Sequence, residues 1–170
     1  IATGAGFTID RTVSTSGLFG VQTIAANAPI TVAKGITVNG ADTLQRQASG
    51  ALALQASVSV PGAGKVALAA SLDTTTAPGV SLLNLSFAPG KSIDYGATNR
   101  GGTLSINGQS YGLLYAMSDL AGINGSLGGR YALATDLDAG GTTYTSAVIA
   151  PGMPNIDTPF TGTLTGLGHA

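Results

Sequence analysis

A glycine followed by alternating aliphatic residues recurs through the middle of this chain. The repeat units are Gly35-Ile36-Thr37-Val38, Gly50-Ala51-Leu52-Ala53-Leu54, Gly64-Lys65-Val66-Ala67-Leu68, Gly79-Val80-Ser81-Leu82 and Gly102-Thr103-Leu104-Ser105-Ile106. The first four glycines are almost evenly spaced, and the fifth lies farther along the chain. Alternation with a period of two predicts short strands with one buried face. Glycine suits the corners between such strands, where φ is positive or a neighbour comes close. The repeat therefore predicts an all-β protein.

Short strands broken this often fit a sandwich, a barrel or a solenoid of stacked coils. Hairpin signals are sparse, because the strong two-residue turns are Asn39-Gly40 and Asn107-Gly108, and each fits a solenoid corner equally well. We therefore favour the solenoid. A coil of roughly 20 to 25 residues, as in comparable repeat folds, gives about seven coils. Each coil is stabilised by the coils on either side, so we expect open strand edges at both ends.

The composition suits thin layers of small aliphatic side chains. Of the 170 residues, 44% are hydrophobic but only 5% are aromatic and 9% charged, and 26 are glycine. The net charge is −1 and the seven basic residues are scattered, which argues against nucleic acid as a partner. No basic cluster or long apolar run predicts membrane insertion. The lack of cysteine excludes disulfides, thiolate catalysis and cysteine-ligated metals.

The C-terminal third of the chain carries a more specific pattern. It consists of residues 112–120 (GLLYAMSDL), 129–138 (GRYALATDLD) and 159–169 (PFTGTLTGLGH). This pattern resembles stretches of large secreted adhesins of Gram-negative bacteria, of the filamentous-haemagglutinin-like or autotransporter-like type, whose passenger regions are right-handed parallel β-helices. The resemblance covers about residues 100–169. It implies that residues 1–170 form a single right-handed parallel β-helix segment, an internal fragment of a longer passenger exported through an outer-membrane secretion pore.

By this resemblance the function is that of a non-catalytic adhesin or extended stalk segment at the bacterial cell surface. Its partner would be a glycan or protein on a host or neighbouring cell, and no cofactor is expected. One alternative is a self-assembling extracellular filament or matrix protein, in which the open coil ends associate end to end. A second is a polysaccharide-acting β-helix enzyme that uses Asp136 and Asp138.

Asp136 and Asp138 flank Leu137 in a predicted strand, so both carboxylates are expected on one face. Such a pair can bind Ca²⁺ or do acid–base chemistry on a polysaccharide. The turn Ala139-Gly140-Gly141 follows at once, however, which favours solvated corner residues, and no Lys or Arg is placed to complete a site. We therefore predict no catalytic or metal-binding residue, with these two aspartates as the candidates should one exist.

Three tyrosines are candidates for surface binding, since their rings can stack on sugars: Tyr111, Tyr131 and Tyr144. The single histidine, His169, lacks partners for a metal site or a nucleophilic triad, so we predict a structural role in the Gly-Leu-Gly-His turn. Asn84 and Asn124 match the glycosylation acceptor pattern.

Two local signals remain. Ser118 can cap a short helical excursion over residues 118–124, which carries Leu120 and Ile123 on one side. Residues 59–66 (SVPGAGKV) resemble a phosphate-binding loop, but Ser59 replaces its first glycine and Val66 its metal-binding hydroxyl. We interpret this segment as a corner between two strands.

Overall fold

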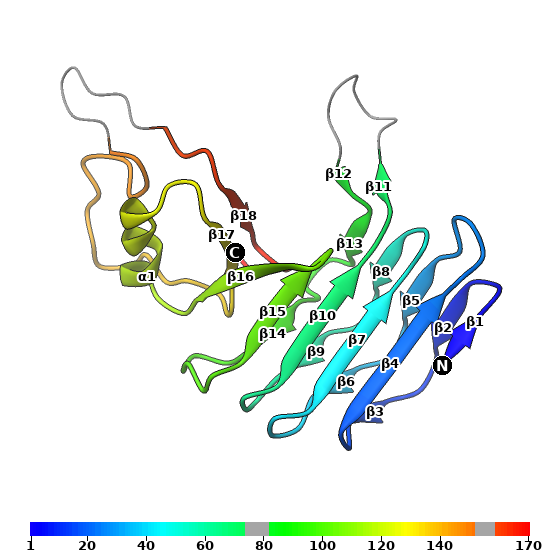
Figure 1. Cartoon of the computed structure of the whole chain (residues 1–170). Helices are drawn as coiled ribbons and strands as arrows, with labels where there is room; N and C mark the ends of the chain where they lie inside the picture. Colours follow the sequence, from blue (N-terminus) through cyan, green and yellow to red (C-terminus); the bar gives the residue numbers. More distant parts are fainter. Residues whose placement is uncertain (74–81, 152–158) are drawn as a thin grey trace.

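The computed structural model describes residues 1–73, 82–151 and 159–170 (Figure 1). Residues 79–81 of the fourth repeat unit lie outside this part. The described protein is all-β with one short α-helix, as predicted. Its strands are β1 (Ala2–Thr3), β2 (Phe7–Ile9), β3 (Val13–Ser14), β4 (Leu18–Thr23), β5 (Ile30–Val32), β6 (Ile36–Thr37), β7 (Thr43–Gln47), β8 (Leu52–Leu54), β9 (Val58–Ser59), β10 (Lys65–Ala69), β11 (Leu72–Asp73), β12 (Leu82–Leu83), β13 (Leu85–Phe87), β14 (Ile93–Asp94), β15 (Thr103–Ile106), β16 (Gln109–Leu114), β17 (Arg130–Leu133) and β18 (Thr163–Thr165).

Up to β15, and apart from β11 and β12, successive strands belong in turn to three sheets whose strands pair in parallel. Sheet A begins with β1, β4, β7, β10 and β15, sheet B consists of β2, β5, β8 and β13, and sheet C of β3, β6, β9 and β14. We call three successive strands, one from each sheet, a rung, so that β2, β3 and β4 form the first rung and β13, β14 and β15 the fourth. Figure 1 shows the long strands of sheet A side by side across the front of this stack.

The rungs repeat at the length expected for a coil. In sheet B, Phe7 pairs with Ile30 and Ile30 with Leu52. Both steps fall within the predicted coil length of roughly 20 to 25 residues, which is therefore confirmed. The next partner, Leu85, comes later than this spacing predicts, because the antiparallel pair β11–β12 lies between the third and fourth rungs.

The evenly spaced glycines each precede a strand, and successive glycines are two strands apart. Gly35, Gly50 and Gly64 lie just before β6, β8 and β10, which belong to sheets C, B and A respectively. Two strands take up two thirds of a coil of roughly 22 residues, or about 15 residues, which matches the distance between successive glycines. The repeat seen in the sequence is thus a step of two strands, and the glycines rotate through the three sheets.

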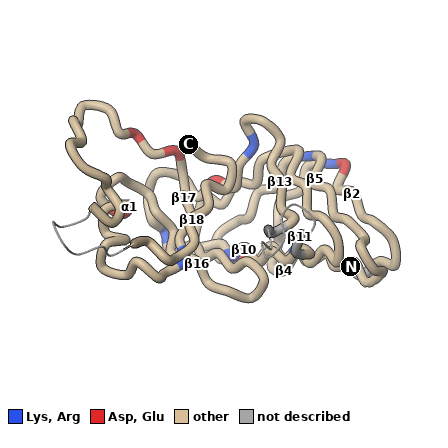
Figure 2. Tube along the Cα trace, turned by 90° about the horizontal axis from the view of Figure 1, so that it is seen from above, with Lys and Arg blue, Asp and Glu red and all other residues tan. Residues whose placement is uncertain are grey.

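Inward-facing side chains stack into apolar columns. In sheet B one column contains Phe7, Ile30, Leu52 and Leu85, and the next contains Ile9, Val32, Leu54 and Phe87. Most of these side chains are buried. Between the two columns, the outward position is Thr8, Thr31, Ala53 or Ser86. The outward positions of sheet B are therefore neutral and mostly hydroxylated, and Figure 2 shows that most of the chain is uncharged.

The stack of rungs ends at a hairpin. Asn107 and Gly108 both have positive φ, at 48° and 75°, and Ile106 pairs with Gln109 so that β16 runs antiparallel to β15. Strands β17 and β18 then add in parallel and extend sheet A to eight strands. We call β16, β17 and β18 the arm. The prediction of about seven coils is wrong, because the residues that the structure describes form four rungs and then this arm.

The predicted helical excursion is present as α1 (Met117–Gly122) and the 3-10 turn η1 (Ile123–Gly125). Its cap differs from the prediction. Asp119, and not Ser118, holds the first turn, because its Oδ2 accepts the backbone N–H groups of Tyr115 at 2.8 Å and Ala116 at 3.2 Å. Within residues 1–73, 82–151 and 159–170, no helix has the length and apolar character needed to span a membrane.

Candidate functional site

The C-terminal residues cover the outer edge of sheet C. The backbone N–H of Ile93 donates to the Leu167 carbonyl at 3.1 Å, and that of Tyr95 donates to the Ala134 carbonyl at 2.8 Å. The Ile93 carbonyl in turn lies 2.9 Å from Nε2 of His169. We call this arrangement the C-terminal closure. The expectation of an open edge at this end of the stack is therefore wrong for sheet C.

Asp136 and His169 hold the closure together. His169 Nδ1 lies 3.1 Å from Asp136 Oδ1, which also accepts the Ala170 backbone N–H at 3.1 Å. The Ala170 N–H, and secondly the His169 ring, lower the pKa of the Asp136 carboxyl below its ordinary value. The carbonyl of Ile93 and the carboxylate are both acceptors, so both ring nitrogens donate only when the ring carries two protons.

Asp138 has a separate, local role. Strand β17 ends at Leu133, so the predicted strand through both aspartates is wrong. Asp138 Oδ1 accepts the Gly140 backbone N–H at 2.7 Å, which fixes the glycine-rich turn. Across the described ranges, no group of three or more His, Cys, Asp or Glu residues could hold a metal ion. The two candidate aspartates are thus engaged with the backbone at different places.

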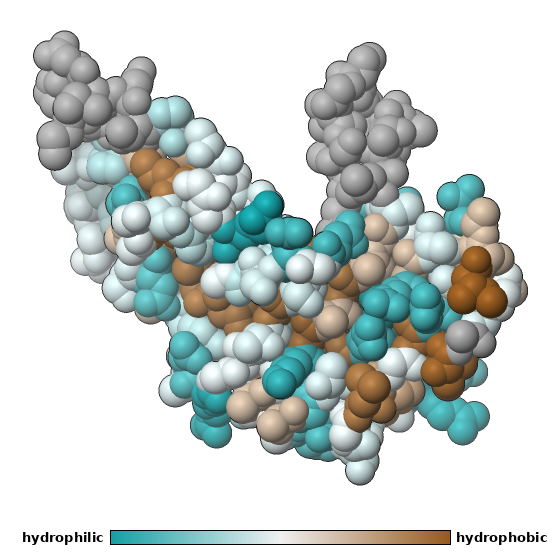
Figure 3. All heavy atoms as spheres, in the orientation of Figure 1, coloured by the Kyte–Doolittle hydropathy of each residue, from teal (hydrophilic) through white to brown (hydrophobic). Residues whose placement is uncertain are grey.

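A cleft of about 430 Å³ lies beyond β13, between the fourth rung and the arm. Its lining is formed by Leu85, Phe87, Ile106, Tyr111, Thr163, Leu164, Thr165, Gly166, Leu167 and Gly168. Most of the side chains in this lining are apolar, hydroxyl groups come from Tyr111, Thr163 and Thr165, and none is charged. Figure 3 shows hydrophobic surface along the junction between the rungs and the arm.

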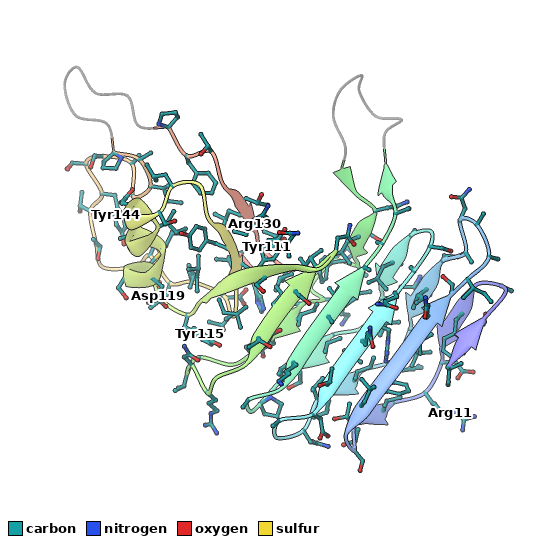
Figure 4. All side chains as sticks on the ribbon, viewed as in Figure 1. Arg11, Tyr111, Tyr115, Asp119, Arg130 and Tyr144 are labelled. Atoms are coloured by element: carbon teal, nitrogen blue, oxygen red, sulfur yellow. The ribbon has the colours of Figure 1, made fainter. Side chains whose placement is uncertain are left out.

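The three candidate tyrosines do not converge on one site. Tyr111 lines the cleft, whereas Tyr131 follows Arg130 on the next strand and points to the opposite face. The Tyr131 hydroxyl donates to the Ser126 carbonyl at 2.7 Å. Tyr144 is exposed and lies on the side of α1 (Figure 4). Each tyrosine therefore presents a different surface.

Arg130 is the charged residue beside Tyr111. The register places Arg130 between Tyr111 of β16 and Thr163 of β18, on the same face of the arm. Figure 4 shows the two labelled residues together where the arm meets the rungs.

Arg46 is an unusual residue that the sequence analysis does not single out. It alternates with Leu44 on β7, faces the core and is 1% exposed. Its Nη1 donates to the carbonyls of Phe19 at 2.8 Å and Gln45 at 2.6 Å, and its guanidinium carbon lies 4.2 Å from the Phe19 ring centre. Burial lowers the pKa of Arg46 to about 10. Among the described residues, its Nε and Nη2 have no hydrogen-bond partner.

The remaining sequence signals have structural roles. Pro61–Gly64 forms the corner between β9 and β10, and a strand follows where a phosphate-binding loop requires a helix. The Asn84 backbone pairs with Leu52 and Ser71. Asn124 Nδ2 donates to the Val148 carbonyl at 2.8 Å. The Asn124 side-chain nitrogen, to which a glycan would be attached, is thus hydrogen-bonded to the chain's own backbone.

In comparisons with known proteins, no family model, curated protein or solved structure matches this chain.

Proposed function

We propose that this chain is a non-catalytic segment of a secreted bacterial surface adhesin of the filamentous-haemagglutinin-like or autotransporter-like type. In this proposal residues 1–170 form one right-handed parallel β-helix segment of a longer passenger. It serves as an extended stalk, exported through an outer-membrane pore, that holds a binding surface for a host or neighbouring-cell glycan or protein. It requires no cofactor.

The observation that carries the proposal is the passage of successive strands through three sheets, in which each strand pairs with its counterpart one rung later. Each coil of a parallel β-helix supplies one strand to each sheet in this way. The neutral outer positions, such as Thr8, Thr31 and Ala53, suit a spacer, because they offer neither a strong electrostatic field nor a large apolar patch. Asp136 and Asp138 are held by backbone hydrogen bonds, which favours a structural over an enzymatic role.

The alternative of end-to-end assembly is supported by the opposite end of the stack. Leu18 on β4 and Ile24 just after it are largely exposed. A depression of about 230 Å³ lies at this end, and its lining combines apolar side chains with a charged pair: Phe7, Thr8, Ile9, Asp10, Arg11, Val13 and Phe19. Figure 3 shows hydrophobic spheres on this N-terminal side. Exposed apolar groups beside free strand edges favour association between molecules.

Electron microscopy of the purified protein tests the stalk against the filament. A stalk segment gives isolated short rods at every concentration, whereas a filament former gives rods that lengthen as concentration rises. Binding to cultured cells and to a panel of glycans, compared between wild type and Tyr144→Ala, tests for adhesion. Turnover of a polysaccharide that is lost in Asp136→Asn would instead support the enzyme and refute the non-catalytic proposal.

A further inference from the structure

Sheet B is incomplete at the C-terminal end of the stack. Sheet A continues past β15 into the arm, and the edge of β14 in sheet C is covered by the C-terminal closure. Within the described ranges, β13 pairs with β8 on one side and borders the cleft on the other. The cleft thus occupies the place of a fifth strand of sheet B.

The edge of β13 offers backbone hydrogen bonds to such a strand. On its inner side, the Leu52 N–H donates to the Asn84 carbonyl and the Ala88 N–H donates to the Leu54 carbonyl, both at 2.8 Å. Because bonding alternates along a parallel strand, the N–H and C=O groups of Leu85 and Phe87 point toward the cleft. No backbone partner for these four groups occurs in the part of the chain that the structure describes.

The neighbouring sheet shows what completion of such an edge requires. Ile93 in β14 and Tyr95 just after it alternate with Asp94 as Leu85 and Phe87 alternate with Ser86 in β13. Their outward N–H groups are bonded to the carbonyls of Leu167 and Ala134. The next rung of sheet C is therefore supplied by extended backbone from elsewhere in the chain, while the equivalent groups of sheet B face the cleft.

The side chains around the cleft define which strand would fit. The inward columns of sheet B are apolar in all four rungs and end at Leu85 and Phe87. Ile106, Tyr111 and Leu167 extend this apolar lining, and no charged residue contributes to it. A bound strand therefore needs apolar residues at two alternate positions and no charge between them.

We propose that the cleft binds an extended segment of a partner polypeptide, apolar at two alternate positions, as a fifth strand of sheet B. Main-chain bonds to Leu85 and Phe87 supply affinity, and the apolar lining selects the sequence. The proposal does not depend on the adhesin or stalk function. A second copy fits less well, since its free sheet-B strand, β2, belongs to a complete rung and the arm bounds the cleft on the far side.

The test uses a synthetic peptide with the sequence of residues 28–34 (APITVAK), whose Ile30 and Val32 form the inward pair of β5. The control peptide has threonine at both of these positions. Amide hydrogen exchange of the whole protein, read by NMR, should slow at Leu85 and Phe87 when the first peptide is added and stay unchanged with the control. Loss of the two apolar side chains weakens binding by at least about tenfold.

Two matched variants locate the site. Thr163→Lys introduces a charge at an exposed position that lines the cleft on the same face of the arm as Tyr111, and Thr8→Lys makes the same change at an exposed position of β2, at the other end of the stack. We expect peptide affinity to fall about tenfold or more in Thr163→Lys and to be unchanged in Thr8→Lys. Circular dichroism confirms that both variants fold.

Three results would overturn the proposal. The first is no exchange protection in wild type at millimolar peptide, and the second is protection that maps to the first rung instead of β13. The third is a dimer in light scattering that Thr163→Lys abolishes, because the cleft would then receive a second copy of this chain. None of these outcomes bears on whether the protein is a stalk.

Discussion

Gly64 precedes β10 at a point where two core valines leave no room for a side chain. A Cβ added to Gly64 would lie 2.8 Å from Cγ1 of both Val38 and Val60, which are 0% exposed. Ordinary contact begins at 3.4 Å, so each methyl group would have to retreat by several tenths of an ångström within a closed core. Gly35 holds the equivalent place before β6, but there the added Cβ would meet only the Ser57 carbonyl, at 3.7 Å.

These distances predict opposite effects for one substitution. Overpacking destabilises the folded protein by about 1–3 kcal/mol, whereas the lower conformational entropy of an unfolded chain with alanine stabilises it by about 0.4–1 kcal/mol. Gly64→Ala should therefore lower the free energy of unfolding by about 1–2 kcal/mol. Gly35→Ala should raise it by about 0.4–1 kcal/mol, because only the second effect operates. At about 2–4 °C per kcal/mol, the two midpoints of thermal unfolding should differ by roughly 3–12 °C.

Urea unfolding followed by circular dichroism measures both variants against wild type. If their free energies of unfolding agree within about 0.5 kcal/mol, the close approach at Gly64 does not constrain the core and the packing argument is refuted. A Gly64→Ala protein that is more stable than wild type would also refute the packing argument.

Three further predictions concern the charged and titratable groups. Arg46→Met should raise the free energy of unfolding by about 1–3 kcal/mol at pH 7, because it removes a buried charge that has only some of its hydrogen bonds. If urea unfolding shows a lower free energy of unfolding in the variant, the hydrogen bonds of the guanidinium contribute more than its burial costs. The pKa of Asp136 is lowered in the folded state, so its stabilising effect is present above the ordinary aspartate pKa and is lost as pH falls through the folded value. The protection of the Ala170 amide, measured as its exchange rate relative to an unstructured peptide at the same pH, should therefore fall in acid in wild type, and Asp136→Ala should show this low protection already at pH 6. His169→Ala should lower the free energy of unfolding in urea by about 1–3 kcal/mol, since the ring is 5% exposed and has a polar partner on each nitrogen. Tyr144→Ala, at an exposed side chain, should change it by less than about 0.5 kcal/mol. Equal effects of the two substitutions would contradict a stabilising role of the C-terminal closure.

The repeating part of the fold is accessible from sequence because its signals are local. Alternation at Gly50–Leu54 and Gly64–Leu68 fixes which side chains face inward, and the coil length follows from general geometry. The helix near residue 118 is predictable for the same reason. Its cap is wrongly assigned to Ser118 because the rule for a residue at the start of a helix takes no account of Asp119 reaching back to the preceding backbone.

The features at the C-terminal end depend on contacts that local patterns do not encode. Asn107-Gly108 suits both a hairpin and a corner, and only the pairing of β15 with β16 decides between them. The closure joins Ile93 to His169, which are 76 residues apart. Arg46 escapes sequence reasoning because a charged residue in an alternating strand is ordinarily assigned to the outer face, although its phase with Leu44 places it inward.

The long reach of the closure has a consequence for the order of folding. Pairing between the first three rungs closes loops of one coil each, whereas the bond between His169 and Ile93 closes a loop of 76 residues. Loop-closure entropy and the need for a preformed β14 both favour late docking of the C-terminal residues. During synthesis the rungs can therefore assemble one by one while the outer edge of β14 stays unpaired. We expect this transient edge to be the site at which incompletely folded chains aggregate.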